Sequence, residues 1–178
     1  MRWIAAALFF VATLCAQGGG SVQFRDLAAM AATGKPVMPC AELRSLTSYD
    51  LSVISANVIP ASSEAPEHCR VNLMVLPEIN IQVNLPTAWN GRLYMFGNGG
   101  WAGEPFESAG RAAHRARGLK AGFMTAATDT GHSVLSEPGA SFALNRQKLL
   151  DFGFRAMHVT AVTAKTIAAA YYATPPAK

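Results

Sequence analysis

Residues 89–103 read WNGRLYMFGNGGWAG, an apolar run between a tight-turn signal and a glycine-rich loop. The Asn-Gly pair at 90–91 favours a turn, and residues 92–96 have the apolar character of a strand inside a sheet. After a helical segment comes a second short apolar run, residues 123–128, and then the longest helical segment, residues 151–173. This order of strand, helix, strand and helix predicts a parallel sheet with right-handed crossovers, and hence an α/β fold.

Further strands are predicted before this region. Residues 51–59 are rich in Val and Ile and end at Pro60, and residues 70–76 form another apolar run. Residues 79–85 alternate between apolar side chains at odd-numbered positions and Asn or Gln at even-numbered ones. Such alternation is typical of an antiparallel strand with one side in the core and the other in water. Short helical segments are expected at residues 26–32, 41–46 and 107–117, the last ending at Gly118.

Composition limits the class of protein. The 178 residues carry 15 Lys and Arg against 11 Asp and Glu, a formal charge of +4 at neutral pH, and 51% are hydrophobic while 15% are charged. These values exclude a disordered charged tail, and the length suits one domain with a sizeable core. A charge this small and scattered predicts no nucleic-acid partner. One local basic cluster is expected to be the solvent-facing side of a helix; it comprises Arg111, Arg115, Arg117 and Lys120.

Residues 1–18 have the order of a secretory signal peptide. Arg2 supplies the positive start, residues 3–15 are apolar but too short to span a membrane, and small residues follow at Ala16 and Gly18. Removal of this segment leaves a predicted mature chain of residues 19–178 with no membrane segment, in a secreted or periplasmic protein. The alternative is an N-terminal helix buried in the fold.

The cysteine content agrees with export. Cys15 belongs to the predicted leader, and Cys40 and Cys69 remain as an even pair in an oxidising compartment. We therefore predict a disulfide between Cys40 and Cys69. Two buried free thiols are the alternative.

The glycine-rich loop, residues 97–103, follows a predicted parallel strand, and open α/β sheets place their sites at such strand ends. Glycine lets the backbone approach a ligand and aim N–H groups at an anion. One interpretation is an oxyanion hole, in which these donors meet the charge that develops on an ester carbonyl. A plain tight turn is the alternative, and a dinucleotide site is a weaker one because no helix opens directly from the loop.

Asp129 and His132 follow the next predicted strand. They could form a catalytic dyad or hold a metal, but two ligands do not make a zinc site and no third stands nearby. We favour the interpretation that both fix the turn through hydrogen bonds to the backbone, and we predict no metal site. No serine lies in the G-x-S-x-G pattern of a nucleophile elbow; the nearest approaches are at Ser21, Ser133 and Ser141.

Three blocks of this sequence resemble the tannase and feruloyl esterase family of secreted α/β-hydrolases. They are WNGR leading into FGNGGWAG at residues 89–103, ATDTGH at residues 127–132 and DFGFRAMH at residues 151–158. The likeness covers residues 40–178. It implies a carboxylic ester hydrolase that cleaves esters of aromatic acids, such as gallic or hydroxycinnamic acid, through an acyl-serine intermediate and a Ser-His-Asp triad.

The resemblance also implies roles for single residues. It makes Gly99 or Gly100 a donor of the oxyanion hole and matches Cys40 and Cys69 to an N-terminal disulfide. Structural roles near the site but outside the triad are expected for Asp129, His132 and Trp101.

In the family a Cys-Ser pair follows shortly after the long helix, and the triad Asp and His come after a large lid domain that often binds calcium. The nucleophile, Asp and His are therefore expected beyond Lys178. We expect residues 19–178 to be the N-terminal part of an α/β-hydrolase, without nucleophile strand and lid and inactive alone. The expected substrate is a small aromatic ester, no cofactor is expected in this chain, and the oligomeric state is left open.

The alternative function is a secreted, non-catalytic binding module for aromatic esters or plant-derived ligands, with Trp101 and Phe106 as its aromatic surface. Against this module, the strand at residues 92–96 would be an exposed sheet edge without a nucleophile strand beside it, which is an aggregation hazard. A stable monomer would favour the module, whereas an aggregating chain would favour the esterase fragment.

Overall fold

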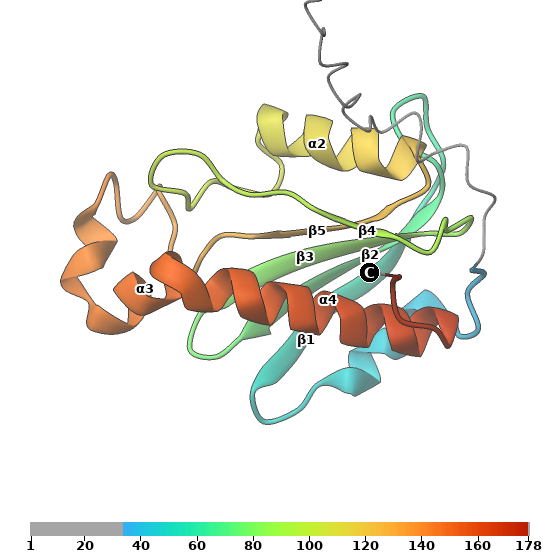
Figure 1. Ribbon diagram of the computed structural model, residues 1–178, viewed down its shortest axis with the longest axis horizontal. Coiled ribbons are helices and arrows are strands. Elements are labelled where there is room, and N and C mark those ends of the chain that lie inside the picture. The colour runs from blue at the N-terminus through green and yellow to red at the C-terminus, as the bar shows by residue number, and fades with distance from the viewer. Residues whose placement is uncertain (1–33, 178) are drawn as a thin grey trace, which may run out of the picture.

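A five-stranded mixed sheet forms the centre of the protein (Figure 1). The computed structural model describes residues 34–177, so the predicted signal peptide and the predicted helix at 26–32 lie outside the described residues. The order of the strands in the sheet is β1-β2-β3-β5-β4. Their bounds are β1 Leu51–Ile59, β2 His68–Val75, β3 Ile79–Pro86, β4 Leu93–Met95 and β5 Met124–Thr128.

The sheet changes from antiparallel to parallel along its width. β1, β2, β3 and β5 pair antiparallel in turn, with Ile81 of β3 opposite Thr128 of β5. β4 and β5 then pair parallel, with Leu93 opposite Met124. The fold class predicted from the sequence, antiparallel strands leading into a parallel α/β unit, is confirmed.

β4 lies at the edge of the sheet formed by the described residues. It has three residues, all half-buried, and pairs with β5 alone. The strand predicted at residues 92–96 is thus present, and among the described residues it lies at the sheet edge, as expected where no nucleophile strand pairs with it. The apolar content of the run indicated a strand, but the number of neighbours depends on where the sheet places it.

Helices cover both faces of the sheet, with α2 on one side and α4 on the other (Figure 1). Helix α2 runs to Lys120, past the predicted end at Gly118. The last helical region begins five residues before the predicted Asp151, because α3 leads through one π-helical turn, η3, into α4. The bounds are η1 Cys40–Leu46, α2 Ala109–Lys120, η2 Ser141–Leu144, α3 Arg146–Leu150, η3 Asp151–Arg155 and α4 Ala156–Tyr172.

The apolar core lies between the sheet and α4. The odd-numbered side chains of β3 are fully buried there, as their alternation predicts, and Ile167 and Ala168 of α4 pack against them. Trp89 stacks on Tyr172 with ring centroids 4.3 Å apart, and the Tyr172 hydroxyl donates to the Pro86 carbonyl at 2.7 Å. Burial of these aromatic rings anchors the end of α4 to the sheet.

The opposite face of β3 is polar but buried, so the prediction of a water-facing side is wrong. Gln82 and Asn84 are 4% and 2% exposed because α2 covers them. The Gln82 amide donates to Asn72 Oδ1 at 3.1 Å and accepts from Arg115 Nη1 at 3.0 Å. Buried polar side chains of this kind are tolerated only when hydrogen-bonded, and α2 supplies the partner.

The predicted solvent-facing basic cluster is only half correct. Arg117 and Lys120 are exposed, but Arg111 and Arg115 are buried and point toward the sheet. Arg115 reaches Glu107 Oε2 at 2.6 Å, and Glu107 also meets Arg70 at 3.2 Å. A charged residue on a helix need not face water when buried acceptors lie beneath it.

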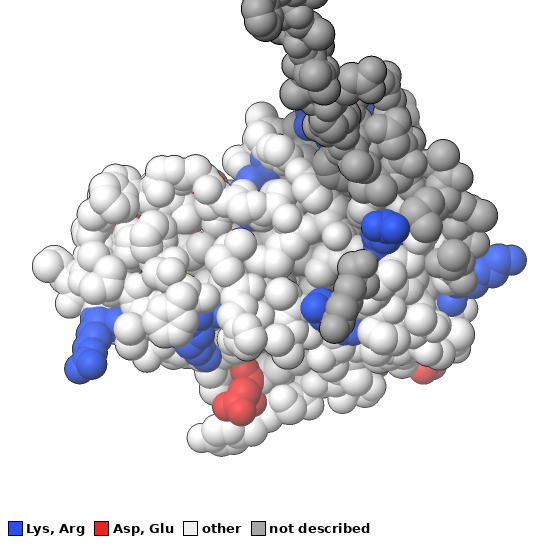
Figure 2. Space-filling model, viewed as in Figure 1, with Lys and Arg blue, Asp and Glu red and all other residues white. Residues whose placement is uncertain are grey.

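The disulfide predicted between Cys40 and Cys69 is present, joining η1 to β2. Among residues 34–177, no helix is both long enough and apolar enough to cross a membrane. The face of the molecule that carries α4 is mostly uncharged, with Lys and Arg at separate points (Figure 2). This face shows no continuous basic surface.

Candidate active site

The two loops that follow the parallel strands β4 and β5 lie together at one edge of the sheet. The Asn98 amide donates to the Thr128 carbonyl at 2.9 Å, and the Val134 amide donates to the Gly103 carbonyl at 3.0 Å. Parallel pairing causes this meeting, because it places the carboxyl ends of both strands at the same edge. The glycine loop, residues 97–103, and the Asp129 turn, residues 129–133, therefore form one site.

Backbone conformation in the glycine loop depends on glycine at two positions. Gly100 has a φ of +52°, and the Ala102 amide donates back to the Gly99 carbonyl at 2.9 Å, which closes a turn. Gly103 has a φ of +78°, and a Cβ there would lie 2.8 Å from His132 Nε2. Only glycine combines this conformation with so close an approach.

The amides at the tip of the loop are available to a ligand. Within the part of the chain that the structure describes, the N–H groups of Gly99, Gly100 and Trp101 donate to no protein acceptor. Gly99 and Gly100 are exposed, and no atom would contact a Cβ at either position. Adjacent unpaired backbone donors at a strand end are the elements of an anion-binding site.

The Asp129 carboxylate stabilises the Asp129 turn through hydrogen bonds. Its Oδ1 accepts from the amides of Asn80 and Gly131 at 3.0 and 2.9 Å, and its Oδ2 accepts from the Asn80 side chain at 2.7 Å. Burial raises the pKa of Asp129 above its ordinary value, and the hydrogen bonds from Asn80 and Gly131 oppose this shift. With both oxygens engaged, the carboxylate makes no hydrogen bond to His132.

His132 is buried in an aromatic setting. Its ring stacks on Phe142 with centroids 3.9 Å apart, and its Nδ1 lies 3.4 Å from the Thr130 hydroxyl. Its Nε2 is buried with no hydrogen-bond partner among the described residues. The pair Asp129 and His132 thus lies in one turn but is not joined as a dyad.

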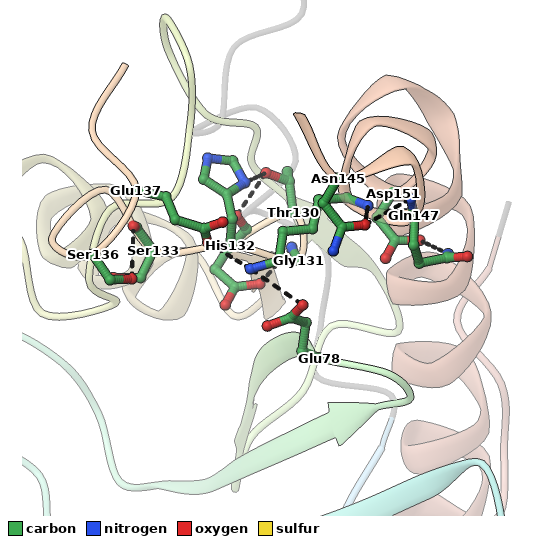
Figure 3. A network of polar contacts seen from close by, with 12 residues as sticks. Glu78, Thr130, Gly131, His132, Ser133, Ser136, Glu137, Asn145, Gln147 and Asp151 are labelled. Atoms are coloured by element: carbon green, nitrogen blue, oxygen red, sulfur yellow. Dashed lines mark hydrogen bonds and ion pairs between the residues drawn. The ribbon is translucent and has the colours of Figure 1, made fainter. Parts of the chain in front are cut away.

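Polar contacts surround this turn on two sides (Figure 3). On one side, Lys148 Nζ joins Glu137 at 2.6 Å and Glu78 at 3.2 Å. On the other, the fully buried Asp151 meets Gln147 at 2.9 Å and Arg155 at 2.8 Å. These contacts connect α3 to Glu78 and Glu137 and join η3 to α3, while Asp129 itself binds Asn80 of β3.

Arg111 of α2 connects the two loops by hydrogen bonds to residues next to each of them. Its guanidinium donates to the Thr128 carbonyl at 2.5 Å and to the Glu104 carbonyl at 3.1 Å. The Phe106 ring lies against this guanidinium at 5.0 Å. Phe106 thus contacts Arg111 of α2, and a shared surface of Phe106 and Trp101 stays a prediction.

An apolar hollow of about 270 Å³ opens beside the glycine loop. Two of its residues, Ala102 and Thr130, have φ values of +61° and +64°, which are strained for side chains with a Cβ. Strain of this kind clusters at functional sites, where the surrounding structure maintains it. The hollow is lined by Gly97, Asn98, Gly100, Ala102, Thr130, Phe152 and Met157.

Sequence reasoning missed Phe152 and Met157 as residues of the site. Both lie in residues 151–158, for which the sequence predicts one regular helix. The π turn η3 inserts an extra residue into the helical repeat, so periodicity could not give their directions.

The described residues contain neither a Ser-His pair nor a metal site. No serine hydroxyl is hydrogen-bonded to a histidine within residues 34–177. Ser141 begins the 3-10 helix η2 and does not follow a strand. No group of three or more His, Cys, Asp or Glu side chains in this part of the chain could hold a metal ion.

Comparison with known proteins gives the family of the chain. Residues 63–178 match the sequence model of the tannase and feruloyl esterase family. This match spans more than half of the chain, and the chain belongs to that family. The resemblance stated from the three sequence blocks is confirmed.

Individual relatives agree with this family. An uncharacterized esterase of Xanthomonas campestris is 33% identical over 173 residues, which cover 86% of this chain and 29% of the relative. A probable feruloyl esterase of Arthroderma benhamiae is 30% identical over 174 residues, covering 87% of this chain and 31% of the relative. The chain thus spans less than a third of the length of these relatives.

A solved structure supports the fold. The crystal structure of an esterase from Aspergillus oryzae superposes with a TM-score of 0.64 at 23% identity. The likeness covers 78% of this chain and 31% of that esterase. It shows a shared arrangement of strands and helices.

Proposed function

We propose that this chain supplies the oxyanion-hole part of a serine carboxylic ester hydrolase that acts on esters of aromatic acids. The observation that carries the proposal is the set of unpaired amides at Gly99, Gly100 and Trp101, at the carboxyl ends of two parallel strands. Family membership supports the reaction class, and relatives named feruloyl esterase support an aromatic acid as the acyl group.

In the proposed reaction, a serine hydroxyl attacks the ester carbonyl carbon and the carbonyl electron pair moves onto oxygen. The amides of the glycine loop donate to this oxyanion, and each such donor contributes about 3 kcal/mol of barrier lowering in serine hydrolases. Collapse of the intermediate expels the alcohol and leaves an acyl-serine, which water hydrolyses to the free acid. We assign the nucleophile and its histidine to residues other than those of the described site.

Preorganisation is the contribution of the described residues. Arg111 and Asn98 both donate to the Thr128 carbonyl and so connect the glycine loop to the Asp129 turn. Donors held in place before the reaction stabilise the developing charge without reorganising during it. Asp129 and Gly103 serve the same end, because they fix the turn against which the loop packs.

We also propose that the protein is exported, with residues 1–18 as signal peptide. The disulfide between Cys40 and Cys69 supports an oxidising compartment. The calcium that the resemblance implies for a lid domain has no donor set among residues 34–177, and no step above uses it.

The oxyanion hole can be tested on the 178-residue chain by amide NMR during titration with benzoate. A carboxylate oxygen presents the charge of the oxyanion, so the amide protons of Gly99 and Gly100 are expected to shift downfield with a saturating curve. Gly139, an exposed glycine outside the glycine loop, is the internal control. Shifts at Gly99 and Gly100 no larger than at Gly139 would overturn the proposal.

An assay complements the titration. The purified 178-residue chain is expected to give no hydrolysis of methyl gallate or methyl ferulate above background, because oxyanion donors without a nucleophile give only weak assistance. Turnover that a serine-directed inhibitor abolishes would show that the nucleophile lies within the chain after all.

A further inference from the structure

The sequence contains two Asn-Gly pairs, Asn90-Gly91 and Asn98-Gly99. Asparagine followed by glycine is chemically labile, because the backbone nitrogen of the next residue can attack the side-chain amide carbon and glycine has no Cβ to block the approach. The two pairs share this local chemistry. Their different surroundings in the fold therefore decide which of them reacts.

Asn90 makes hydrogen bonds through both ends of its side-chain amide. It is 4% exposed, its Nδ2 donates to the Ala121 carbonyl at 2.9 Å, and its Oδ1 accepts from the Arg92 amide at 3.0 Å. Its own backbone amide donates to the Gly122 carbonyl at 2.9 Å. The side chain cannot turn its amide carbon toward the next backbone nitrogen without breaking two hydrogen bonds in a buried setting.

Asn98 is held through its side-chain nitrogen alone. Nδ2 donates to the Thr128 carbonyl at 2.9 Å, whereas Oδ1 accepts no hydrogen bond from the described residues. The residue is half-buried and has a glycine on either side in the chain. One hydrogen bond, rather than two, must open before this side chain can rotate.

The nitrogen that must attack Asn98 is also accessible. Gly99 is exposed, and among residues 34–177 its N–H donates to no protein acceptor. Apart from its chain neighbours, no atom lies within 4 Å of the position that a Cβ would take at Gly99. Because water reaches this N–H, hydroxide can remove its proton and make the nitrogen nucleophilic.

We propose that Asn98 is a site of spontaneous deamidation, and that its conversion disconnects the glycine loop from the Asp129 turn. The Gly99 nitrogen gives up its proton and forms a bond to Asn98 Cγ. The Cγ–Nδ2 bond breaks as Nδ2 takes up a proton and leaves as ammonia. Water then opens the resulting cyclic imide at one of its two carbonyls and yields aspartate or isoaspartate, so water is the only co-reactant.

The product lacks the donor that joins the two loops. A carboxylate only accepts, so it repels the Thr128 carbonyl to which the Asn98 amide donated. Arg111 donates to the same carbonyl, so the new charge lies next to its guanidinium and competes for it. The isoaspartate form also adds a methylene group to the backbone of the loop. Both products therefore remove a contact that fixes the geometry of the site.

Peptide mass spectrometry of the incubated 178-residue chain tests the site, with Asn90 as internal control. Trypsin cleaves after Arg92 and so separates the two pairs, into residues 71–92 and 93–111. In the folded chain at mildly alkaline pH, conversion at Asn98 is expected to be at least about fivefold faster than at Asn90, the factor that one further hydrogen bond gives. Equal rates, or no conversion at Asn98, overturn the proposal.

Two controls assign the difference to the fold and to the attacking nitrogen. In guanidinium chloride both pairs lose their surroundings and are expected to convert at similar rates; a difference that persists there overturns the role of the fold. Gly99→Ala places a Cβ beside the attacking nitrogen without meeting another atom, so it should slow conversion at Asn98 and leave Asn90 unchanged. Unslowed conversion in Gly99→Ala overturns the attack by this nitrogen.

Hydrogen exchange measures the consequence for the loop. Asn98→Asp reproduces the aspartate product, and Asn57→Asp adds the same charge at an exposed position of β1, at the other edge of the sheet. The Ala102 amide, which donates to the Gly99 carbonyl, is expected to exchange at least about fivefold faster in Asn98→Asp and at an unchanged rate in Asn57→Asp. Melting temperatures confirm that both variants fold. Equal exchange in both variants overturns the proposed disconnection.

Deamidation at Asn98 is independent of the proposed function, because none of these measurements involves an ester or an oxyanion. Conversion at Asn98 without any response of the loop amides to benzoate would overturn the oxyanion hole alone. A response of those amides to benzoate without conversion at Asn98 would overturn the modification site alone.

Discussion

His68 shows how a single side chain is set by its surroundings. It is 2% exposed at the start of β2, and its Nδ1 lies 2.8 Å from the Pro66 carbonyl. A carbonyl only accepts, so Nδ1 carries the proton, and the buried Nε2 is an acceptor without a partner among residues 34–177. Burial, with Arg70 and Arg115 nearby, lowers the pKa of His68 below its ordinary value.

This lowered pKa predicts a dependence of stability on pH. Below about pH 6.5 the unfolded chain binds a proton at His68 that the folded chain does not, so the free energy of unfolding decreases as pH falls. Urea unfolding of His68→Gln at pH 7.5 and 5.5 is expected to show a smaller decrease than the unchanged chain. His158→Gln, at an exposed position of α4, is the control and should keep the full decrease. An equal decrease in His68→Gln and the unchanged chain would contradict the prediction.

The burial of Arg111 and Arg115 could not be predicted from the sequence around them. Composition and helical spacing identified a basic helix, and they correctly placed Arg117 and Lys120 in water. The sequence of α2 does not reveal the acceptors of these two side chains. Arg111 donates to a backbone carbonyl of β5, and Arg115 donates to a side-chain amide of β3. Those acceptors come from segments distant in sequence, and only folding brings them beneath the helix.

At the scale of elements, α2 packs directly on the sheet at Gly118. A Cβ at this position would be 2.6 Å from Thr125 Cγ2 of β5 and 2.8 Å from Tyr94 Cδ1 of β4. The helix continues through this glycine, which the sequence suggested as its end, and the close contact accounts for a residue without a side chain at this position. Gly118 is needed for packing, not for termination.

The effect of this contact can be measured with two substitutions in one helix. Gly118→Ala is expected to lower the free energy of unfolding by about 1–3 kcal/mol through overpacking, despite the better helix propensity of alanine. Gly110→Ala, where a Cβ meets no atom, should instead raise it by about 0.5 kcal/mol. Chemical denaturation of both variants provides the test. A Gly118→Ala variant as stable as Gly110→Ala would rule out the close packing.

The π turn is the second element that the sequence did not reveal. Apolar spacing in residues 151–173 predicted a helix, and helix is present throughout α4. The extra residue in η3 changes the directions of the side chains in this turn relative to α4. Phe152 borders the hollow, whereas Phe154 is 65% exposed. Helical periodicity assumes a constant turn, so it fails at this insertion.

At the scale of the whole molecule, the disulfide joins η1 to the start of β2 across 29 residues of sequence. Both cysteines are buried, and Leu43 of η1 is in the core. The bridge restricts the unfolded chain more than the folded one.

Loss of this bridge is expected to lower the free energy of unfolding by about 3 kcal/mol. Thermal unfolding with and without a reductant measures the effect. A Cys40→Ala, Cys69→Ala double variant should melt lower than the oxidised chain and be insensitive to the reductant. A reductant effect that persists in the double variant would assign the loss to another cause.

The sequence by itself determined the class of the fold, the disulfide partners, the apolar face of β3 and the loop that carries the unpaired amides. Each of these follows from local pattern: alternation, cysteine number, or glycine between two apolar segments. Tertiary structure alone decided that the polar face of β3 is buried, that Arg111 and Arg115 point inward, and that Phe152 and Met157 border the site. The physical reason is that burial of a polar group depends on partners from distant segments, which local periodicity does not contain.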